Sequence, residues 1–204
     1  MKKTRSLGFP IDKMVLGALL TALVVVLQFA GAFVKFGAFS VSLVLVPIAI
    51  GAIVCGPAIG AWLGFVFGMV VLLSGDAAWF MGFNAFGTVL TVLLKGSLAG
   101  FVAGLVYKLV SRFNQYTAAI SAAIVCPIVN SGVFALGCYV FFLKDLGLAV
   151  ASGEVGQYSS ATAYVFLGLI GGNFIFELLL NTVLSPVIAT LVNLAKRELG
   201  RRKR

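Results

Sequence analysis

A lysine inside an apolar run is the first residue of this sequence whose chemistry needs an explanation. Lys95 lies within the hydrophobic segment 86–106, which is long enough to cross a lipid bilayer. A charged side chain at such a depth is costly, and proteins usually keep one there for a partner or a ligand. Asn173, Glu177 and Asn181 recur every four residues in the last hydrophobic segment, so they share one helical face. Together these groups predict a polar site within a membrane-embedded bundle.

Helix geometry predicts that polar groups from three segments meet at one depth. Lys95 comes nine positions after Phe86, which places it roughly 14 Å below the outer edge of its helix. Asn173 falls at a similar depth in its own segment, with Glu177 about one turn deeper and Asn130 level with Glu177. In this interpretation the ammonium binds an anionic or carbonyl group of a solute, and the other groups bind its hydroxyls or amides. The alternative is a structural Lys95–Glu177 ion pair with asparagines that hydrogen-bond between helices.

Further candidates for substrate binding lie above this layer and in the outer loops. They are Thr91, Asn84, Trp79, Phe80, Lys35 and Phe36. Thr91 and Asn84 form a polar track that descends toward Lys95 from an outer loop. Trp79 and Phe80 lie in a glycine-flanked aromatic loop, which suits either the interfacial aromatic belt of a membrane protein or a lid over a ligand.

The composition identifies an integral membrane protein. Hydrophobic residues make up 61% and charged residues 10% of the chain, against about 45 to 50% and about 25% in soluble proteins. Because a membrane-spanning helix needs about 20 mostly apolar residues, we predict an all-α bundle of six transmembrane helices. The expected spans are 14–33, 41–54, 57–74, 86–110, 117–143 and 161–194. We expect the short second span to be tilted, kinked at Pro47 or incomplete.

The basic residues predict how the chain is oriented. Six spans place both ends on one side of the membrane, and Lys and Arg accumulate in cytoplasmic segments. Twelve basic residues fall on the side of the two ends, against Lys35 and Lys144 on the other. We therefore predict cytoplasmic termini and a single membrane domain over 1–204, with basic tails at 1–12 and 195–204. This bias accounts for most of the net charge of +9 and disfavours nucleic-acid binding.

Several kinds of catalysis are disfavoured by what the sequence lacks. It contains no histidine, which is the usual general base of nucleophilic triads and the commonest metal ligand. Its three cysteines, Cys55, Cys126 and Cys138, have no metal-ligand spacing and are expected to be buried. The run LKGS at 94–97 has its lysine before the glycine, so it is not a phosphate-binding loop. We predict no catalytic residue, metal site or cofactor, and any ATP-driven step must use another polypeptide.

Small residues indicate where helices pack closely. Glycines repeat every four residues at 60, 64 and 68 and again at 96, 100 and 104. Such stripes let helix backbones approach each other in lipid, and we favour packing within the chain over a dimer interface. Ala18 and Ala22 form a shorter pair in the first span, which suits an internal contact or docking of another membrane subunit.

The ordered set of these motifs resembles a known family. It comprises six spans in about 200 residues, the run ALLTA at 18–22, VPIAIGAIVCGP at 46–57, GAWLGFVFG at 60–68 and LLKGSLAGFVAGLVYK at 93–108. In this combination the chain is similar to the substrate-binding S components of energy-coupling factor (ECF) transporters. The likeness covers nearly the whole chain.

The resemblance implies a function in nutrient uptake. An S component captures a vitamin or related micronutrient from outside the cell and docks on a module of one transmembrane scaffold subunit and two ATPases. Ala18 and Ala22 would contact the scaffold, and the pocket would lie in the outer halves of the later helices, capped by loops. Lys95 and the aromatic loop suit a carboxylate-bearing vitamin, with pantothenate first and folate, riboflavin or a queuosine-type compound next. The alternative is a stand-alone secondary transporter or channel that couples ions through Glu177.

Overall fold

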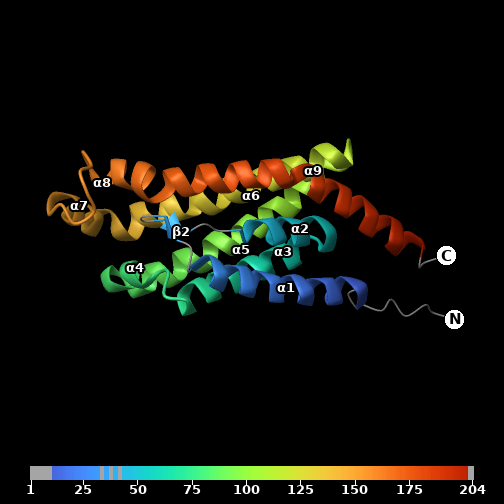
Figure 1. Cartoon of the computed structure of the whole chain (residues 1–204), viewed down its shortest axis with the longest axis horizontal. Coiled ribbons are helices and arrows are strands. Elements are labelled where there is room, and N and C mark those ends of the chain that lie inside the picture. The colour runs from blue at the N-terminus through green and yellow to red at the C-terminus, as the bar shows by residue number, and fades with distance from the viewer. Residues whose placement is uncertain (1–10, 33–34, 37–38, 41–42, 202–204) are drawn as a thin grey trace.

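The helices of the computed structural model run roughly parallel to one long axis and form an elongated bundle (Figure 1). The structure describes residues 11–32, 35–36, 39–40 and 43–201. Its elements are α1 (Ile11–Ala32), β1 (Lys35–Phe36), β2 (Phe39–Ser40), α2 (Leu45–Cys55), α3 (Pro57–Leu73), α4 (Ala78–Phe83), α5 (Ala85–Val110), α6 (Gln115–Gly137), η1 (Cys138–Phe142), α7 (Leu143–Ala151), α8 (Ala161–Ala163), η2 (Tyr164–Gly171) and α9 (Gly172–Arg201). The η segments are π-helical turns that continue the helices before them.

Each of the six predicted spans overlaps a helix of the described structure. Within the described residues, four helical stretches are long and apolar enough to cross a membrane, at Lys13–Gly31, Ala85–Val110, Gln115–Ala151 and Ala161–Leu184. The other two, α2 and α3, are apolar but shorter, with 11 and 17 residues. The predicted all-α class is confirmed, and the two-residue antiparallel pair of β1 and β2 is its one addition among the described elements. The number of membrane crossings stays a prediction.

The second span is short because it ends at a sharp turn. Gly56 has a φ of 104°, a conformation that favours glycine, and Pro57 starts α3 directly after it. Pro47 lies in the first turn of α2, where its missing N–H breaks no helical hydrogen bond. Of the three expectations for this span, a kink at Pro47 is therefore not what shortens it.

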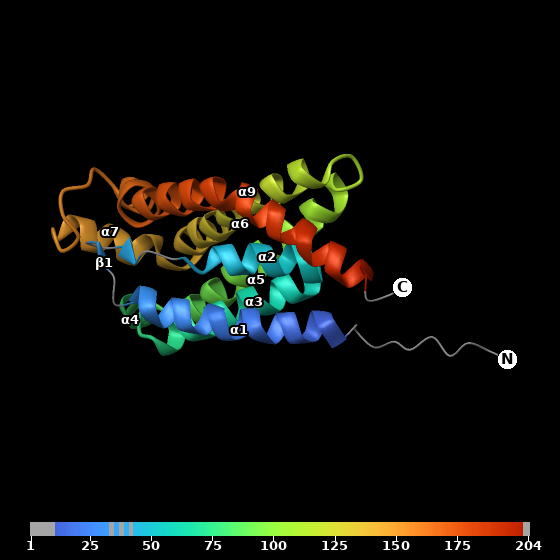
Figure 2. The same ribbon diagram turned by 45° about the vertical axis from the view of Figure 1, so that its right-hand side comes forward.

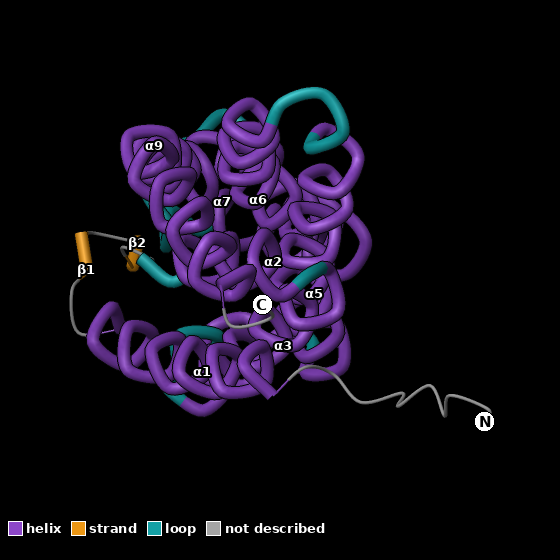
Figure 3. The backbone as a smooth tube through the Cα atoms, turned by 90° about the vertical axis from the view of Figure 1, so that its right-hand side faces the viewer, coloured by secondary structure: helices purple, strands orange, loops and turns teal. Residues whose placement is uncertain are grey.

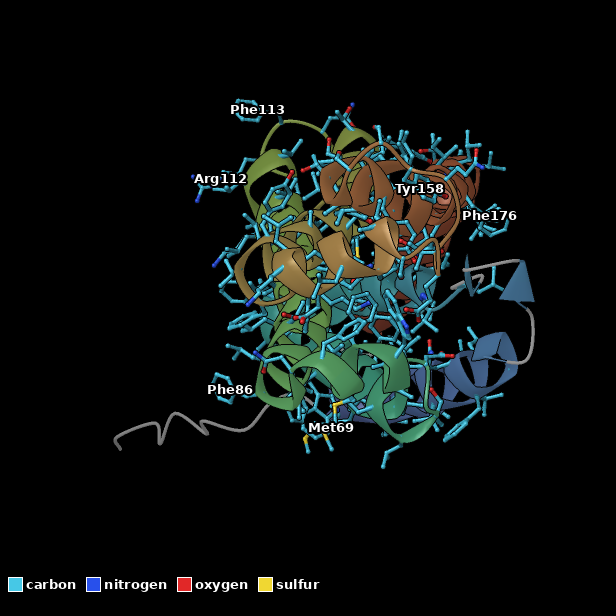
Figure 4. The ribbon with its side chains drawn as sticks, turned by 90° about the vertical axis from the view of Figure 1, so that its left-hand side faces the viewer. Met69, Phe86, Arg112, Phe113, Tyr158 and Phe176 are labelled. Atoms are coloured by element: carbon cyan, nitrogen blue, oxygen red, sulfur yellow. The ribbon has the colours of Figure 1, made fainter. Side chains whose placement is uncertain are left out.

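The short helix α2 occupies the centre of the bundle. It packs against α1, α3, α5, α6 and α9, and the view along the long axis shows it surrounded by these helices (Figure 3). Eight of its residues are buried. Large apolar side chains such as Met69, Phe86 and Phe176 instead project outward (Figure 4), as lipid contact requires.

The glycine stripes join α3 directly to α5. A Cβ atom on Gly64 would collide with the main-chain oxygen of Gly96, and one on Gly60 would come within 2.5 Å of the Gly100 oxygen. The two backbones therefore touch, which only glycine permits. This confirms the prediction that both stripes mediate packing between helices of the same chain.

The two ends of the described chain lie at the same end of the bundle. The start of α1 and the end of α9 are found there, together with the turn between α5 and α6 (Figures 1 and 2). The opposite end carries α4 and α7, in segments where the sequence predicts outer loops. An even number of crossings fits this arrangement. Which end faces the cytoplasm stays a prediction.

Candidate functional site: a polar cavity between the helices

A cavity of about 140 Å³ lies among the helices and takes its lining from both polar and aromatic residues. It is lined by Gln28, Phe67, Val71, Asp76, Ala77, Phe80, Val92, Lys95, Asn130, Ser131, Phe134, Leu169, Ile170, Asn173 and Glu177. Five of the predicted site residues are in this set: Lys95, Asn130, Asn173, Glu177 and Phe80. The structure thus brings together the polar layer that helix geometry predicted from three separate segments.

Lys95 extends from α5 toward two aromatic rings. Its ammonium nitrogen lies 5.0 Å from the ring centroid of Phe134 on α6 and 5.7 Å from that of Phe67 on α3. Both distances fit cation–π attraction, which partly replaces lost hydration. No ion pair joins Lys95 to Glu177 in the described part of the chain, and the Glu177 Oε2 atom has no hydrogen-bond partner. The structural ion pair considered as an alternative is therefore not formed.

The lining residues of α6 and α9, the α6 and α9 wall, present hydrogen-bond acceptors. The Asn173 Nδ2 amide donates to Glu177 Oε1 at 3.0 Å, and Glu177 is only 1% exposed. Glu177 Oε2, Asn173 Oδ1 and Asn130 Oδ1 are buried without a hydrogen-bond partner. Because buried polar atoms in native proteins are almost always paired, three orphan oxygens on one cavity indicate a place for a ligand or water.

Three polar residues of the lining escaped the sequence prediction: Ser131 of α6, and Gln28 and Asp76, which bond to each other. The Gln28 Nε2 amide of α1 donates to Asp76 Oδ2 at 2.7 Å, so α1 is tied to the turn between α3 and α4. A signal was present for each residue of this bonded pair, since Gln28 is the only amide of the segment 14–33 and Asp76 the only acid of 74–84. Neither signal says which way the side chain faces, which is why only the structure reveals their common site.

The helix α4 covers part of the cavity. Phe80 packs edge-to-face on Phe134 and Phe142, with ring centroids 5.6 and 5.1 Å apart. Trp79 does not line the cavity. Its ring packs on Tyr164 at 6.3 Å, and its Nε1 donates to Glu154 at 3.4 Å in the loop after α7. This placement of Phe80 favours the covering role of the aromatic loop, with Trp79 joining the cover to the neighbouring loop.

The remaining predicted site residues lie elsewhere. Asn84 caps the start of α5, where its Oδ1 accepts a hydrogen bond from the Gly87 N–H at 2.8 Å. Thr91 is buried against Gly137, and its hydroxyl has no partner. Neither is part of the cavity lining. Lys35 and Phe36 form β1, and their side chains lie outside the described part of the structure.

Comparison with known proteins places the chain in a family. The family model described as "ECF transporter, substrate-specific component" matches residues 12–189. The chain belongs to this family. Its fold is similar to that of a solved structure of ThiT from Listeria monocytogenes serovar, with a TM-score of 0.64 and 20% sequence identity over 92% of this chain and 96% of that chain. At this identity the likeness shows the fold alone. No curated protein matches the sequence.

Membership of the ECF family confirms the resemblance that the sequence motifs carried. Members are the substrate-binding subunits of transporters, so this S component acts in transport and not as an enzyme. The three cysteines are free and buried, as expected. Ala18 and Ala22 lie exposed on one face of α1, where a second membrane subunit can reach them.

Proposed function

We propose that this S component captures a vitamin or related micronutrient outside the cell and delivers it through an ECF-type ATP-driven importer. The observation that carries the proposal is the cavity, which is lined by a lysine and by residues with unpartnered buried oxygens inside a bundle of apolar helices. Charged groups at this depth of a membrane protein mark ligands or pathways. ATP hydrolysis belongs to two partner ATPases, which act through a transmembrane scaffold subunit.

The position of the cavity supports capture from outside. Asp76 and Ala77, in the turn between α3 and α4, and Phe80 of α4 contribute to its lining. This turn and α4 lie at the end of the bundle opposite to the described chain ends. Since Lys and Arg accumulate on the side of the two ends, we place those ends in the cytoplasm. The cavity then lies in the outer half of the cell membrane.

Lys95 indicates one chemical group of the solute but does not identify the whole molecule. A lysine under an aromatic cover suits a carboxylate or carbonyl group, which is why the sequence alone placed pantothenate before folate, riboflavin or a queuosine-type compound. A cavity of about 140 Å³ holds roughly one benzene-sized group. A whole vitamin would therefore require the Phe80 cover to move as it binds.

Two experiments test the proposal. Native mass spectrometry of the protein purified in detergent should reveal a copurifying small nutrient, released on unfolding. Liposomes that contain this protein should accumulate that nutrient only when the scaffold and both ATPases are added with ATP. Sustained uptake by the chain alone would favour the stand-alone carrier instead, and failure of the complete importer to take up any copurifying solute would contradict the proposal.

A further inference from the structure

The two walls of the cavity differ in the hydrogen-bonding groups that they offer. The α5 wall carries the Lys95 ammonium, which can only donate. On the α6 and α9 wall, the buried polar atoms without a partner are all oxygens, from Asn130, Asn173 and Glu177. Asn130 is 4% and Glu177 1% exposed. A solute that fills this space must therefore bring hydrogen-bond donors to one wall and acceptors to the other.

The hydrogen bonds within the α6 and α9 wall show which of its polar atoms are left for a solute. Because the Asn173 Nδ2 amide donates to Glu177 Oε1, the Asn173 oxygen must be the free end of that side chain. One turn further along α9, the Asn181 amide donates to the main-chain oxygen of Glu177, so it supplies no donor to the carboxylate. Neither of these two amides satisfies Glu177 Oε2.

The charged residues of the lining indicate which kind of hydrogen-bond donor the solute carries. The buried carboxylate of Glu177 and the ammonium of Lys95 both line the cavity. Lys95 makes no ion pair with Glu177 and rests on the rings of Phe67 and Phe134. A buried carboxylate gains most from a charged N–H donor, because such hydrogen bonds are about twice as strong as neutral ones. A hydroxyl would satisfy one acceptor and leave the charge of Glu177 uncompensated.

We propose that the substrate of this S component is bipolar, with a protonated nitrogen that donates to Glu177, Asn130 and Asn173 and an acceptor group held by Lys95. This inference rests on the proposed function and narrows the class of nutrient. Pantothenate has a carboxylate but no protonated nitrogen, so it does not belong to this class. Amine- or amidine-bearing solutes with a carboxylate or carbonyl at the other end do.

Three flat one-ring probes test the two poles separately: benzamidine, benzamide and benzoate. They have nearly the same shape and differ in charge, and their ring matches a cavity of about 140 Å³ with aromatic walls. Binding of each is measured by ligand-observed NMR on the detergent-solubilised full chain and on two variants, Glu177→Gln and Lys95→Met. Asp145→Asn is the matched control, because it removes the same charge from a residue that is not buried and does not line the cavity.

The expected result is a crossed pattern. Glu177→Gln should weaken benzamidine binding by at least tenfold and leave benzoate binding unchanged or stronger. Lys95→Met should weaken benzoate binding by a similar factor and leave benzamidine binding unchanged or stronger. Benzamide should respond weakly to both changes, and Asp145→Asn should alter none of the three affinities.

Two outcomes would overturn the inference. One is benzamidine binding that is unsaturable in the unmodified protein or insensitive to Glu177→Gln. If that variant does not fold, Asn173→Leu, at a half-buried position, removes another of the proposed acceptors, and unchanged benzamidine binding by it would overturn the inference as well. The other is a copurified nutrient without a protonated nitrogen, which would leave the proposed function intact. Conversely, the crossed pattern in a protein whose complete importer transports nothing would uphold the bipolar site and reject the proposed function.

Discussion

The interface between α3 and α5 and the cavity wall formed by α6 and α9 are built on opposite principles. At the first, glycines such as Gly64 and Gly96 bring two backbones into contact and leave no space. At the second, Asn130 and Glu177 stand beside open volume with oxygen atoms unpaired. Dense packing is what holds a bundle together in lipid, where the hydrophobic effect between helices is absent. The comparison indicates that the glycine interface supplies stability which the polar wall gives up for binding.

The largest effect is expected from filling the glycine interface. Gly64→Ala places a methyl group against the main-chain oxygen of Gly96, which cannot rotate away. We expect a loss of about 3 kcal/mol or more in the free energy of unfolding, and a sharp fall in the thermal midpoint measured in detergent. Gly82→Ala is the matched control, since a methyl group there meets nothing within 4 Å. Equal thermal midpoints for both variants would show that α3 and α5 are not held by backbone contact.

The second prediction separates the docking face of α1 from the cavity. Ala18→Trp combined with Ala22→Trp adds bulk on an exposed face of α1, away from the cavity lining. We expect uptake by the complete importer to be abolished, because the scaffold can no longer approach. The dissociation constant of the captured nutrient should stay within twofold of that of the unmodified protein. Normal transport by the double variant would remove these alanines from the docking surface.

The third prediction addresses the cation on the α5 wall. Lys95→Met keeps a long apolar side chain between Phe67 and Phe134 but removes the donor. We expect the bound nutrient to lose more than tenfold in affinity, measured by isothermal titration calorimetry, with little change in the thermal midpoint of the empty protein. Lys144→Met, at an exposed position, is the control. An unchanged dissociation constant would take Lys95 out of the binding site.

The smallest effect tests a residue that the structure places outside the cavity. Thr91→Val removes a buried hydroxyl without a partner and keeps the shape of the side chain against Gly137. We expect the free energy of unfolding to rise by less than about 1 kcal/mol, because an unsatisfied polar group is lost. Nutrient affinity should not change. A marked loss of affinity would return Thr91 to the binding site, as the sequence predicted.

The helices and their contacts were readable from the sequence because apolar length and small-residue spacing act locally. Glycines four residues apart lie on one helical face, so close packing of each stripe on a neighbouring helix could be predicted without knowing the fold, but the pairing of the two stripes came from the structure. The same rule brought Lys95, Asn130 and Glu177 to one layer. The depth of a residue along a helix can be calculated by counting residues, and the structure places these three residues on one cavity, as that calculation predicted.

The direction in which a side chain faces around its helix was harder to predict than its depth. Gln28 and Asp76 are single polar residues in their segments, and a single residue defines no face, so their meeting at 2.7 Å depends on how α1 packs. Asn84 and Thr91 were assigned to a polar track, but Asn84 caps α5 and Thr91 turns to α6. Helix caps and helix neighbours compete for the same polar side chains as a ligand does, and spacing alone does not decide between them.

The π-helical segments set where the protein can change shape. Leu169 and Ile170 of η2 line the cavity, and Phe142 of η1 supports the Phe80 cover. Such wide turns return to ordinary helix when the hydrogen-bond register slips by one residue. The α3–α5 pair has no comparable freedom, since its main chains are already in contact. We therefore expect any widening that admits a nutrient to occur on the side of the Phe80 cover and the π-helical segments, while the contact between α3 and α5 stays closed.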